Sequence, residues 1–231
     1  MKIADENWDY YSGLPNPSWY ETNNNMKISY AIPVCNELME IQRLISFLLQ
    51  TKQPDDEVVV LFDSTNGSDE VKDYLMSASE RGGFKWYDYS FDGHFGNMKN
   101  HLTSLCSGDY IFQIDADELP HAVLMENIHD ILELNDIDVI VVPRVNTVEG
   151  LTEEHIKKWG WNVNEDGWVN WPDYQWRIYK NSIDIKWVNK VHEKLDGYTT
   201  ISNLPNDGTM ALFHPKTIKK QEKQNNYYDT L

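Results

Sequence analysis

Residues 108–118 read Gly-Asp-Tyr-Ile-Phe-Gln-Ile-Asp-Ala-Asp-Glu, and this stretch decides the fold. Residues 110–114 are mostly β-branched or aromatic, which predicts a short buried strand. Three carboxylates follow at the carboxyl end of that strand, at Asp115, Asp117 and Glu118. Residues two apart in an extended backbone point to the same side, so Asp115 and Asp117 are expected to face one place. The alternative is a solvated acidic turn before the next helix.

The acidic pair predicts a bound metal ion. Two like charges at one place repel each other and raise each other's pKa unless a cation lies between them. Oxygen-only ligands at the end of a strand suit a hard divalent ion, Mn²⁺ or Mg²⁺. Such an ion keeps open positions that substrate phosphates can fill. We therefore expect Mn²⁺ or Mg²⁺ at Asp115 and Asp117.

The composition restricts the class of protein. The chain has 231 residues, of which 41% are hydrophobic and 13% aromatic, so it is globular. Its net charge of -17 argues against general affinity for nucleic acid or anionic membranes. The two cysteines, Cys35 and Cys106, lie among apolar residues and are expected to be reduced core thiols. We see no signal peptide and no apolar run near the ~18 to 20 residues of a transmembrane segment, so we expect a cytoplasmic protein.

Strands and helices alternate before the acidic stretch. Strands are expected at residues 28–33, 57–62 and 84–89, and helices at 37–49, at 96–106, and between a cap at Ser68 or Asp69 and Arg81. This alternation predicts an α/β fold with a parallel sheet and right-handed crossover helices. Ligands bind such sheets at the carboxyl ends of the strands. Asn36, Glu37 and Asp63 fall at those ends, together with the acidic pair.

The pattern is less regular after the acidic stretch. A helix is expected at residues 122–134, and a strand at 138–143 as a fifth member of the sheet. Residues 145–171 read as irregular and contain Trp159, Trp161, Trp168 and Trp171. Aromatic faces of this kind suit the wall of a binding site, because they stack on sugar rings or bases. The alternative is a second small core.

The last third predicts short strands. Residues 174–179 and 185–191 read as two strands joined by a turn at 181–182, which together form a hairpin. One more short strand is expected at 209–213. The polar residues that follow, with four lysines at 216, 219, 220 and 223, predict a final helix or a frayed end.

Several segments, taken in order, resemble family 2 glycosyltransferases of the GT-A fold. They are a strand ending at Pro33 before Asn36-Glu37, a strand ending at Asp63-Ser64, Gly96-Asn97-Met98-Lys99-Asn100 before a helix, and Gly108-Asp109-Tyr110-Ile111 leading into Asp115-Ala116-Asp117. Residues 187–193, Trp-Val-Asn-Lys-Val-His-Glu, resemble the His-Glu segment of a subset of that family. The resemblance covers residues 27–215.

The resemblance implies a Rossmann-like, mostly parallel central sheet flanked by helices, with a C-terminal hairpin and an acceptor-side region. It also implies metal-dependent transfer of a sugar, with inversion, from a nucleotide-diphosphate sugar, usually a UDP-sugar. The Glu-Asp pair and the Gln-x-x-Arg-Trp motif of processive members do not occur, which favours transfer of a single sugar. Family members often carry two acidic residues where this chain reads Phe62-Asp63-Ser64-Thr65, which leaves the assignment of the base pocket open.

The resemblance also implies roles for single residues. The nucleoside pocket would be lined by Pro33, Asn36 and Glu37, with Asp63 bound to the base and with Lys99 and Asn100 near the base and ribose. Asp115 would bind the ribose and belong to the coordination shell of the ion, and Asp117 would ligate the ion. Residues 1–25 would form an irregular arm and residues 26–231 a single domain. Within that domain, residues 26–118 would bind the nucleotide, 119–215 would form the acceptor half, and 216–231 a polar tail.

The transfer reaction needs a carboxylate as general base for the acceptor hydroxyl. The candidates are Glu193, which we prefer, and Asp173, and each can instead be a surface carboxylate. His214 and His192 are candidates to complete the metal shell, although a lone histidine beside an apolar strand is more often a core or surface residue. Arg177 either pairs with the diphosphate or makes a structural ion pair.

Two other functions are compatible with the sequence. A nucleotidyltransferase also uses an acidic pair and a divalent ion, but it usually has a Gly-rich, basic phosphate loop near the N-terminus, which is missing here. A non-catalytic module would bind the nucleotide-sugar without turnover. The acceptor stays open among a saccharide, a lipid-linked sugar, a protein side chain and a modified nucleobase in nucleic acid.

Overall fold

The structure is a computed structural model that describes residues 26–228, with side chains to residue 223. The irregular arm predicted for residues 1–25 therefore lies outside the described residues. Within them, no helix is long and apolar enough to cross a membrane.

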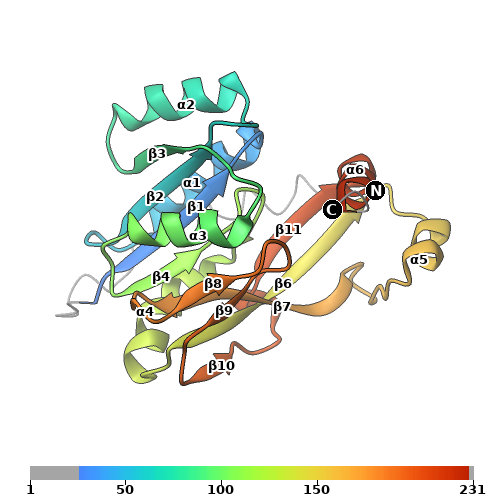
Figure 1. Ribbon diagram of the computed structural model, residues 1–231. Helices are drawn as coiled ribbons and strands as arrows, with labels where there is room; N and C mark the ends of the chain where they lie inside the picture. The colour runs from blue at the N-terminus through green and yellow to red at the C-terminus, as the bar shows by residue number, and fades with distance from the viewer. Residues whose placement is uncertain (1–25, 229–231) are drawn as a thin grey trace.

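The first half of the chain forms one side of a central sheet (Figure 1). Its elements are β1 (Ile28–Val34), α1 (Leu38–Thr51), β2 (Glu57–Asp63), α2 (Asp69–Ser79), β3 (Lys85–Tyr89), α3 (Phe95–Ser104) and β4 (Tyr110–Gln113). The strands are parallel and lie in the order β3-β2-β1-β4. The predicted alternation is thus confirmed, and Ser68 caps α2 by accepting from the Val71 N–H.

Two hydrophobic clusters cover the two faces of the sheet. Side chains alternate along β2, so that Val58 and Val60 join the cluster beneath α1, α2 and α4, while Val59 and Leu61 join the cluster beneath α3. Figure 1 shows α3 in front of the sheet and α1 behind it. Burial on both faces explains why β1, β2 and β4 read as continuous apolar runs.

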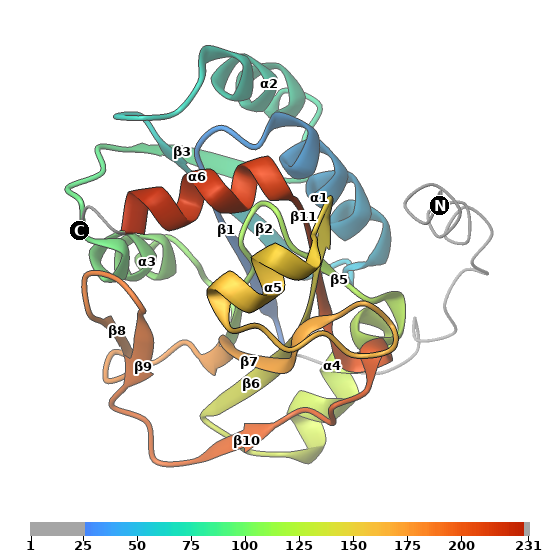
Figure 2. The same ribbon diagram turned by 90° about the vertical axis from the view of Figure 1, so that its right-hand side faces the viewer.

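The second half extends the same sheet. Its elements are β5 (Leu119–Pro120), α4 (Ala122–Leu134), β6 (Val139–Glu149), α5 (Glu153–Trp159), β7 (Val169–Lys180), β8 (Lys186–Val188), β9 (Lys194–Asp196), β10 (Ile201–Asn203), η3 (Gly208–Met210), β11 (Leu212–Thr217) and α6 (Ile218–Tyr228). Beyond β4 the order is β7-β6-β11-β5, and β10 pairs with β6. Figure 2 looks onto this end of the sheet, with α5 and α6 toward the viewer.

The predicted hairpin of residues 174–179 and 185–191 is wrong. β7 inserts between β4 and β6 and runs antiparallel to both, so it is a central strand of the large sheet. β8 pairs instead with β9, and these two strands form a separate two-stranded sheet. The hairpin therefore begins one strand later than predicted, and its connection carries His192 and Glu193.

Three other predictions need correction. Residues 145–171 are not irregular throughout, because β6 continues to Glu149, α5 follows, and β7 begins at Val169. The strand predicted at 209–213 is displaced, since η3 occupies 208–210 and β11 runs to Thr217. Lys216 therefore belongs to the sheet, and the final helix, α6, begins only after it.

Candidate active site

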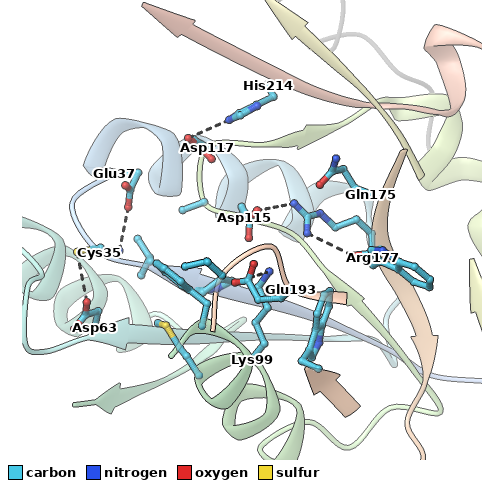
Figure 3. Close-up of a pocket in the computed structure, with 18 of the residues that line it drawn as sticks. Cys35, Glu37, Asp63, Lys99, Asp115, Asp117, Gln175, Arg177, Glu193 and His214 are labelled. Carbon is cyan, nitrogen blue, oxygen red and sulfur yellow. Dashed lines mark hydrogen bonds and ion pairs between the residues drawn. The ribbon is translucent and has the colours of Figure 1, made fainter. Parts of the chain in front are cut away.

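A cavity of about 440 Å³ opens at the carboxyl ends of β1, β2 and β4, where the α/β pattern predicts a ligand (Figure 3). We call it the donor cavity. Ten of the thirteen predicted site residues line it: Pro33, Glu37, Asp63, Lys99, Asp115, Asp117, Arg177, His192, Glu193 and His214. Asn36, Asn100 and Asp173 do not. The donor cavity thus collects residues from β1, β2, α3, β7, β11 and the β8–β9 connection.

Asp115 is paired with a cation of the protein itself. Its carboxylate accepts hydrogen bonds from Arg177 Nη2 at 2.5 Å and from Gln113 Nε2 at 2.8 Å. Burial acts to raise the pKa of Asp115, but Arg177 outweighs it and holds the pKa at about 2. The Asp117 charge still acts to raise the Asp115 pKa, but Arg177 offsets it, a role that the sequence alone assigned to a metal ion.

Glu118 anchors two arginines beneath the donor cavity. Its carboxylate is fully buried and accepts from Arg177 Nε and Nη2, from Arg144 Nη1 and from the Asp115 N–H. A buried charge is tolerated only when it is paired and hydrogen-bonded, as Glu118 is here. The Arg177 ion pair is therefore structural as well as part of the cavity wall.

Asp117 faces a different pair of groups. Its Oδ2 lies 3.3 Å from His214 Nε2 and 3.1 Å from Lys220 Nζ (Figure 3 shows the first contact). Burial acts to raise the pKa of Asp117, but the hydrogen bond and charge of His214, with Lys220, hold it well below its ordinary value. The two acidic residues line one cavity, yet each has its own cationic partners.

His214 has the geometry of a metal ligand. Its Nδ1 lies 2.8 Å from Asn146 Oδ1, and an amide oxygen can only accept, so Nδ1 carries the proton in the neutral ring. In the protonated ring Nε2 donates to Asp117, whereas in the neutral ring Nε2 would offer a lone pair to an ion placed beside Asp117. Ligating histidines in proteins are oriented by this kind of second hydrogen bond.

The predicted set of four metal ligands does not form one cluster. Among residues 26–223, no three His, Cys, Asp or Glu side chains lie close enough to hold an ion together. Asp115 is committed to Arg177, and His192 lies at the exposed tip of the β8–β9 hairpin. Asp117 and His214 remain as a two-ligand set, in which an ion would replace Lys220 Nζ, now 3.1 Å from Asp117 Oδ2. Such a set fits Mg²⁺ or Mn²⁺, which bind through one or two carboxylates and complete their shell with substrate phosphates and water.

The β1 and β2 ends of the donor cavity are held by local hydrogen bonds. Asp63 accepts from the N–H groups of Thr65 and Asn66, and Glu37 accepts from the N–H of Cys35. Burial, with the nearby Asp63 charge, raises the pKa of the Cys35 thiol to about 12, so the thiol is unreactive. Both carboxylates therefore shape loops while they line the cavity.

Glu193 lies on the other side of the cavity, next to Lys99. Glu193 Oε1 is 3.6 Å from Lys99 Nζ, which also lies 4.4 Å from the centre of the Trp187 ring. In Figure 3 this pair and the Asp117–His214 pair are drawn on opposite sides of Asp115. Glu193 is not in a strand, as the sequence predicted, but in the β8–β9 connection, where His192 has a positive φ of 54°.

Close packing positions this connection against α3. The Phe95 N–H donates to the Lys190 carbonyl, and a Cβ on Gly96 would lie 2.8 Å from the Asn189 carbonyl oxygen. Only glycine permits that approach. The Gly96 residue that the family resemblance singled out therefore holds the loop that carries Glu193.

The three predicted residues outside the donor cavity have other contacts. Asn100 binds the Trp187 backbone in both directions, which fixes β8 on α3. Asn36 is exposed on the loop after β1, where its side-chain nitrogen donates to Cys35 Sγ. Asp173 accepts from Arg144 and Asn146 and lines a second, smaller cavity.

Sequence reasoning missed several lining residues. Gln175, Trp176 and Trp187 lie in strands whose pairing was predicted incorrectly, so their faces were unknown. Arg144 and Lys216 line both cavities, but Arg144 falls between the strand predicted at 138–143 and the segment read as irregular from 145, and Lys216 falls in the polar tail. Extending the alternation of β6 beyond Pro143 is the signal that would have found Arg144.

The chain is similar to known glycosyltransferases. The family model "Glycosyl transferase family 2" matches residues 29–219. No curated protein matches the chain. The crystal structure of S. aureus TarS 1-349 in complex with UDP-GlcNAc matches with a TM-score of 0.57 and 16% identity, over 83% of this chain and 59% of TarS 1-349. The complex of the same protein with UDP matches with a TM-score of 0.57 and 17% identity, over 82% and 60%.

These matches differ in what they establish. The identities to TarS are low, so the structures establish the shared fold, and this chain spans about three fifths of their length. The family model covers most of the chain, including every predicted site residue. The chain therefore belongs to glycosyl transferase family 2 and has the GT-A fold.

Proposed function

We propose that this protein transfers a single sugar from a nucleotide-diphosphate sugar, with a UDP-sugar as the favoured donor, to an acceptor hydroxyl with inversion. One observation carries the proposal: the donor cavity combines an acidic pair, already neutralised by cations, with a separate carboxylate, Glu193, on another wall. Membership of glycosyl transferase family 2 supports sugar transfer over nucleotidyl transfer.

The diphosphate would bind beside Asp117 and His214. These two residues would hold Mn²⁺ or Mg²⁺ together with the diphosphate oxygens, with His214 oriented by Asn146. When bound there, the ion would supply Lewis-acid stabilisation of the charge on the leaving diphosphate. Arg177, held by Asp115 and Glu118, adds a fixed positive charge to the same wall.

Glu193 would act as the general base. A displacement with inversion needs one carboxylate that takes the acceptor proton, on the side away from the leaving group. Among the carboxylates that line the donor cavity, Asp115 is paired with Arg177 and Asp117 with His214. Glu37 and Asp63 are held by backbone N–H groups at the β1 and β2 ends, which leaves Glu193 on the remaining wall. Lys99 orients it through the 3.6 Å contact. Asp173 is the weaker candidate, because Arg144 and Asn146 hold its Oδ2 outside the donor cavity.

The nucleoside would occupy the end of the cavity formed by β1 and β2. Pro33, Glu37 and Asp63 line that end, and a carboxylate such as Asp63 can accept the N3–H of uracil. The TarS structures are complexes with UDP-GlcNAc and with UDP, which supports a uridine nucleotide as the donor's nucleotide.

A panel of nucleotide-sugars tests the proposal. The chain is incubated with UDP-, GDP-, ADP- and dTDP-sugars and Mn²⁺, and each is scored for nucleotide release and for the shift in melting temperature. We expect a UDP-sugar to stabilise the protein and to release UDP. Stabilisation without any release, even with acceptors added, would indicate a binding module. Release of pyrophosphate from a nucleoside triphosphate and a sugar phosphate would indicate a nucleotidyltransferase.

A further inference from the structure

α6 follows β11 directly, at the end of the sheet that faces the viewer in Figure 2. Thr217, the last residue of β11, accepts from the Lys220 N–H through its hydroxyl oxygen, which fixes the first turn of the helix. The Ile218 side chain lies against Gly150, just after β6. The fold itself therefore determines where the Lys220 side chain begins.

The ammonium group of Lys220 lies between two carboxylates. Its Nζ is 3.1 Å from Asp117 Oδ2 and 3.5 Å from Oε1 of Glu40, which belongs to the first turn of α1. The Asp117 side chain is 18% exposed and the Glu40 side chain 36%, so one carboxylate is shielded and the other is open to water. Lys220 thus has two anionic partners within reach of one lysine side chain.

The ion proposed for the diphosphate side would use the same oxygen as Lys220. Asp117 Oδ2 lies 3.3 Å from His214 Nε2 and also contacts Lys220 Nζ. A divalent ion ligated by that oxygen would lie next to the ammonium group, and like charges so close repel each other strongly. Lys220 and the ion are therefore alternatives at Asp117.

Asp117 needs a cation when no ion is bound. A carboxylate that is largely buried is tolerated only when it is paired. His214 carries a charge only when its ring is protonated, whereas a lysine is charged at neutral pH. Lys220 is therefore the constant positive charge at Asp117 Oδ2.

The displaced ammonium group would have a partner outside the donor cavity. Lys220 and Glu40 do not line that cavity, whereas Arg144, Arg177 and Lys216 do. The wall of the cavity thus already supplies positive charge for a diphosphate. Glu40 can keep Lys220 paired after the ion has taken Asp117, because the two side chains are already in contact.

We propose that Lys220 takes the place of the divalent ion at Asp117 while no ion is bound, and that it moves to Glu40 when the ion binds. The inference rests on the proposed function and adds a regulatory step to it. The ion must displace a tethered cation before the diphosphate can bind beside it. Lys220 therefore raises the ion concentration at which the donor site forms, because only the displaced state is competent to bind the ion.

Calorimetric titration of Mn²⁺ into the full chain without nucleotide tests the competition. Lys220→Met removes the competing cation, so Mn²⁺ should bind about fivefold more tightly, the upper end for a partly exposed ion pair. Lys219→Met removes the same charge from the exposed neighbour on α6 and should leave Mn²⁺ affinity unchanged. Unchanged or weaker Mn²⁺ binding by Lys220→Met, or an equal gain in Lys219→Met, would overturn the inference.

A double-mutant cycle tests the second partner. Glu40→Gln removes the group to which Lys220 would move, so Lys220 should stay on Asp117 and Mn²⁺ should bind less tightly than in the native chain. In the Lys220→Met background the same change should have no effect on Mn²⁺ affinity, because Glu40 would act only through Lys220. Equal effects of Glu40→Gln in both backgrounds would mean that Glu40 acts by its charge alone, which contradicts the proposed movement.

Thermal unfolding separates replacement of the ion from a structural role of Lys220. Lys220→Met should have a lower melting temperature than the native chain in EDTA, because Asp117 loses its ammonium partner. At saturating Mn²⁺ the two proteins should melt together, since the tighter ion binding of the variant offsets that loss. An equal decrease in both conditions, or no decrease in EDTA, would contradict the inference.

The outcomes also distinguish this inference from the proposed function. If Mn²⁺ and UDP bind the native chain but Lys220→Met behaves like it in every measurement, the role of Lys220 is wrong and the donor site stands. If neither Mn²⁺ nor UDP binds the native chain, the proposed function fails, and the role of Lys220 fails with it.

Discussion

The two sides of the donor cavity are built differently. On the diphosphate side, formed by Asp115, Asp117, Arg177 and His214, every charge is tied to a partner on a strand of the sheet or a residue that follows one. On the transfer side, Glu193 sits in a short connection of a two-stranded hairpin and contacts one cation, Lys99.

This difference fits the separate roles proposed for the two sides. Preorganised charges stabilise a leaving group best when they are fixed in advance, which the diphosphate side provides. A general base must instead meet an incoming hydroxyl, so a loop anchored by packing at Gly96 suits that role. Substitutions on the two sides should therefore separate nucleotide binding from sugar transfer.

The largest expected effect is on the transfer side. Glu193→Gln keeps the size of the side chain but cannot take a proton, so transfer should fall by roughly 10²- to 10⁴-fold. UDP affinity should change little, because the diphosphate side is intact. The measurement is the initial rate of transfer beside UDP binding by calorimetry. Asp173→Asn should lower transfer less, and the reverse order would exchange the roles of the two carboxylates.

The next effect tests the anchor of the hairpin. Gly96→Ala would place a Cβ 2.8 Å from the Asn189 carbonyl oxygen and push the connection that carries Glu193. Misplacement of a catalytic group by about 1 Å costs as much as roughly 10²-fold, so transfer should fall toward that limit while UDP still binds. Gly208→Ala is a matched control, since its Cβ would crowd the Trp168 ring at 2.8 Å, away from the hairpin. Equal loss in both variants would contradict the positional account.

A smaller effect is expected behind the diphosphate side. Asn146→Ala removes the group that orients His214 through Nδ1. Outer partners of this kind contribute roughly 10- to 100-fold to metal affinity or activity. We therefore expect the Mn²⁺ concentration needed for half-maximal UDP binding to rise by that factor, measured by calorimetry at several Mn²⁺ concentrations. An unchanged Mn²⁺ requirement would remove His214 from the ion's shell.

The smallest effect is on acid stability. The pKa of Asp115 is lowered from 3.8 to about 2 in the folded state, with burial opposed by Arg177. A depressed pKa contributes stability that is present above the unfolded value and lost as pH falls from about 4 toward 2. The free energy of unfolding in urea should fall across that range in the native chain and fall less in Asp115→Asn. An equal decrease in the free energy of unfolding in both proteins would show that the Asp115–Arg177 pair does not determine the loss of stability at low pH.

The first half of the fold could be predicted because its signals are local. Apolar runs, a serine cap and polar strand ends define β1 to β4. The second half depends on long-range pairing. No local pattern indicates that β7 lies between β4 and β6. The predicted hairpin was therefore wrong, and Gln175 was not predicted to face the donor cavity.

The chain also held local signals that were not used. Thr152 caps α5 together with His155, and Gly160 ends it in a left-handed conformation, yet the tryptophans made the segment read as irregular. In the site, Asp115 and Asp117 were predicted to bind one cation together. Their separate cationic partners come from β7, β11 and α6, which no spacing in the sequence brings together.

The central claim is that UDP and a divalent ion bind together at Asp117 and His214, independently of Glu193. Titration of UDP into the native chain, Asp117→Asn and Glu193→Gln, each with Mn²⁺ and with EDTA, tests it most directly. We predict metal-dependent UDP binding in the native chain and in Glu193→Gln, and loss of the metal-dependent part in Asp117→Asn. Equal UDP affinity with Mn²⁺ and EDTA in the native chain, or loss of UDP binding in Glu193→Gln, would contradict the account.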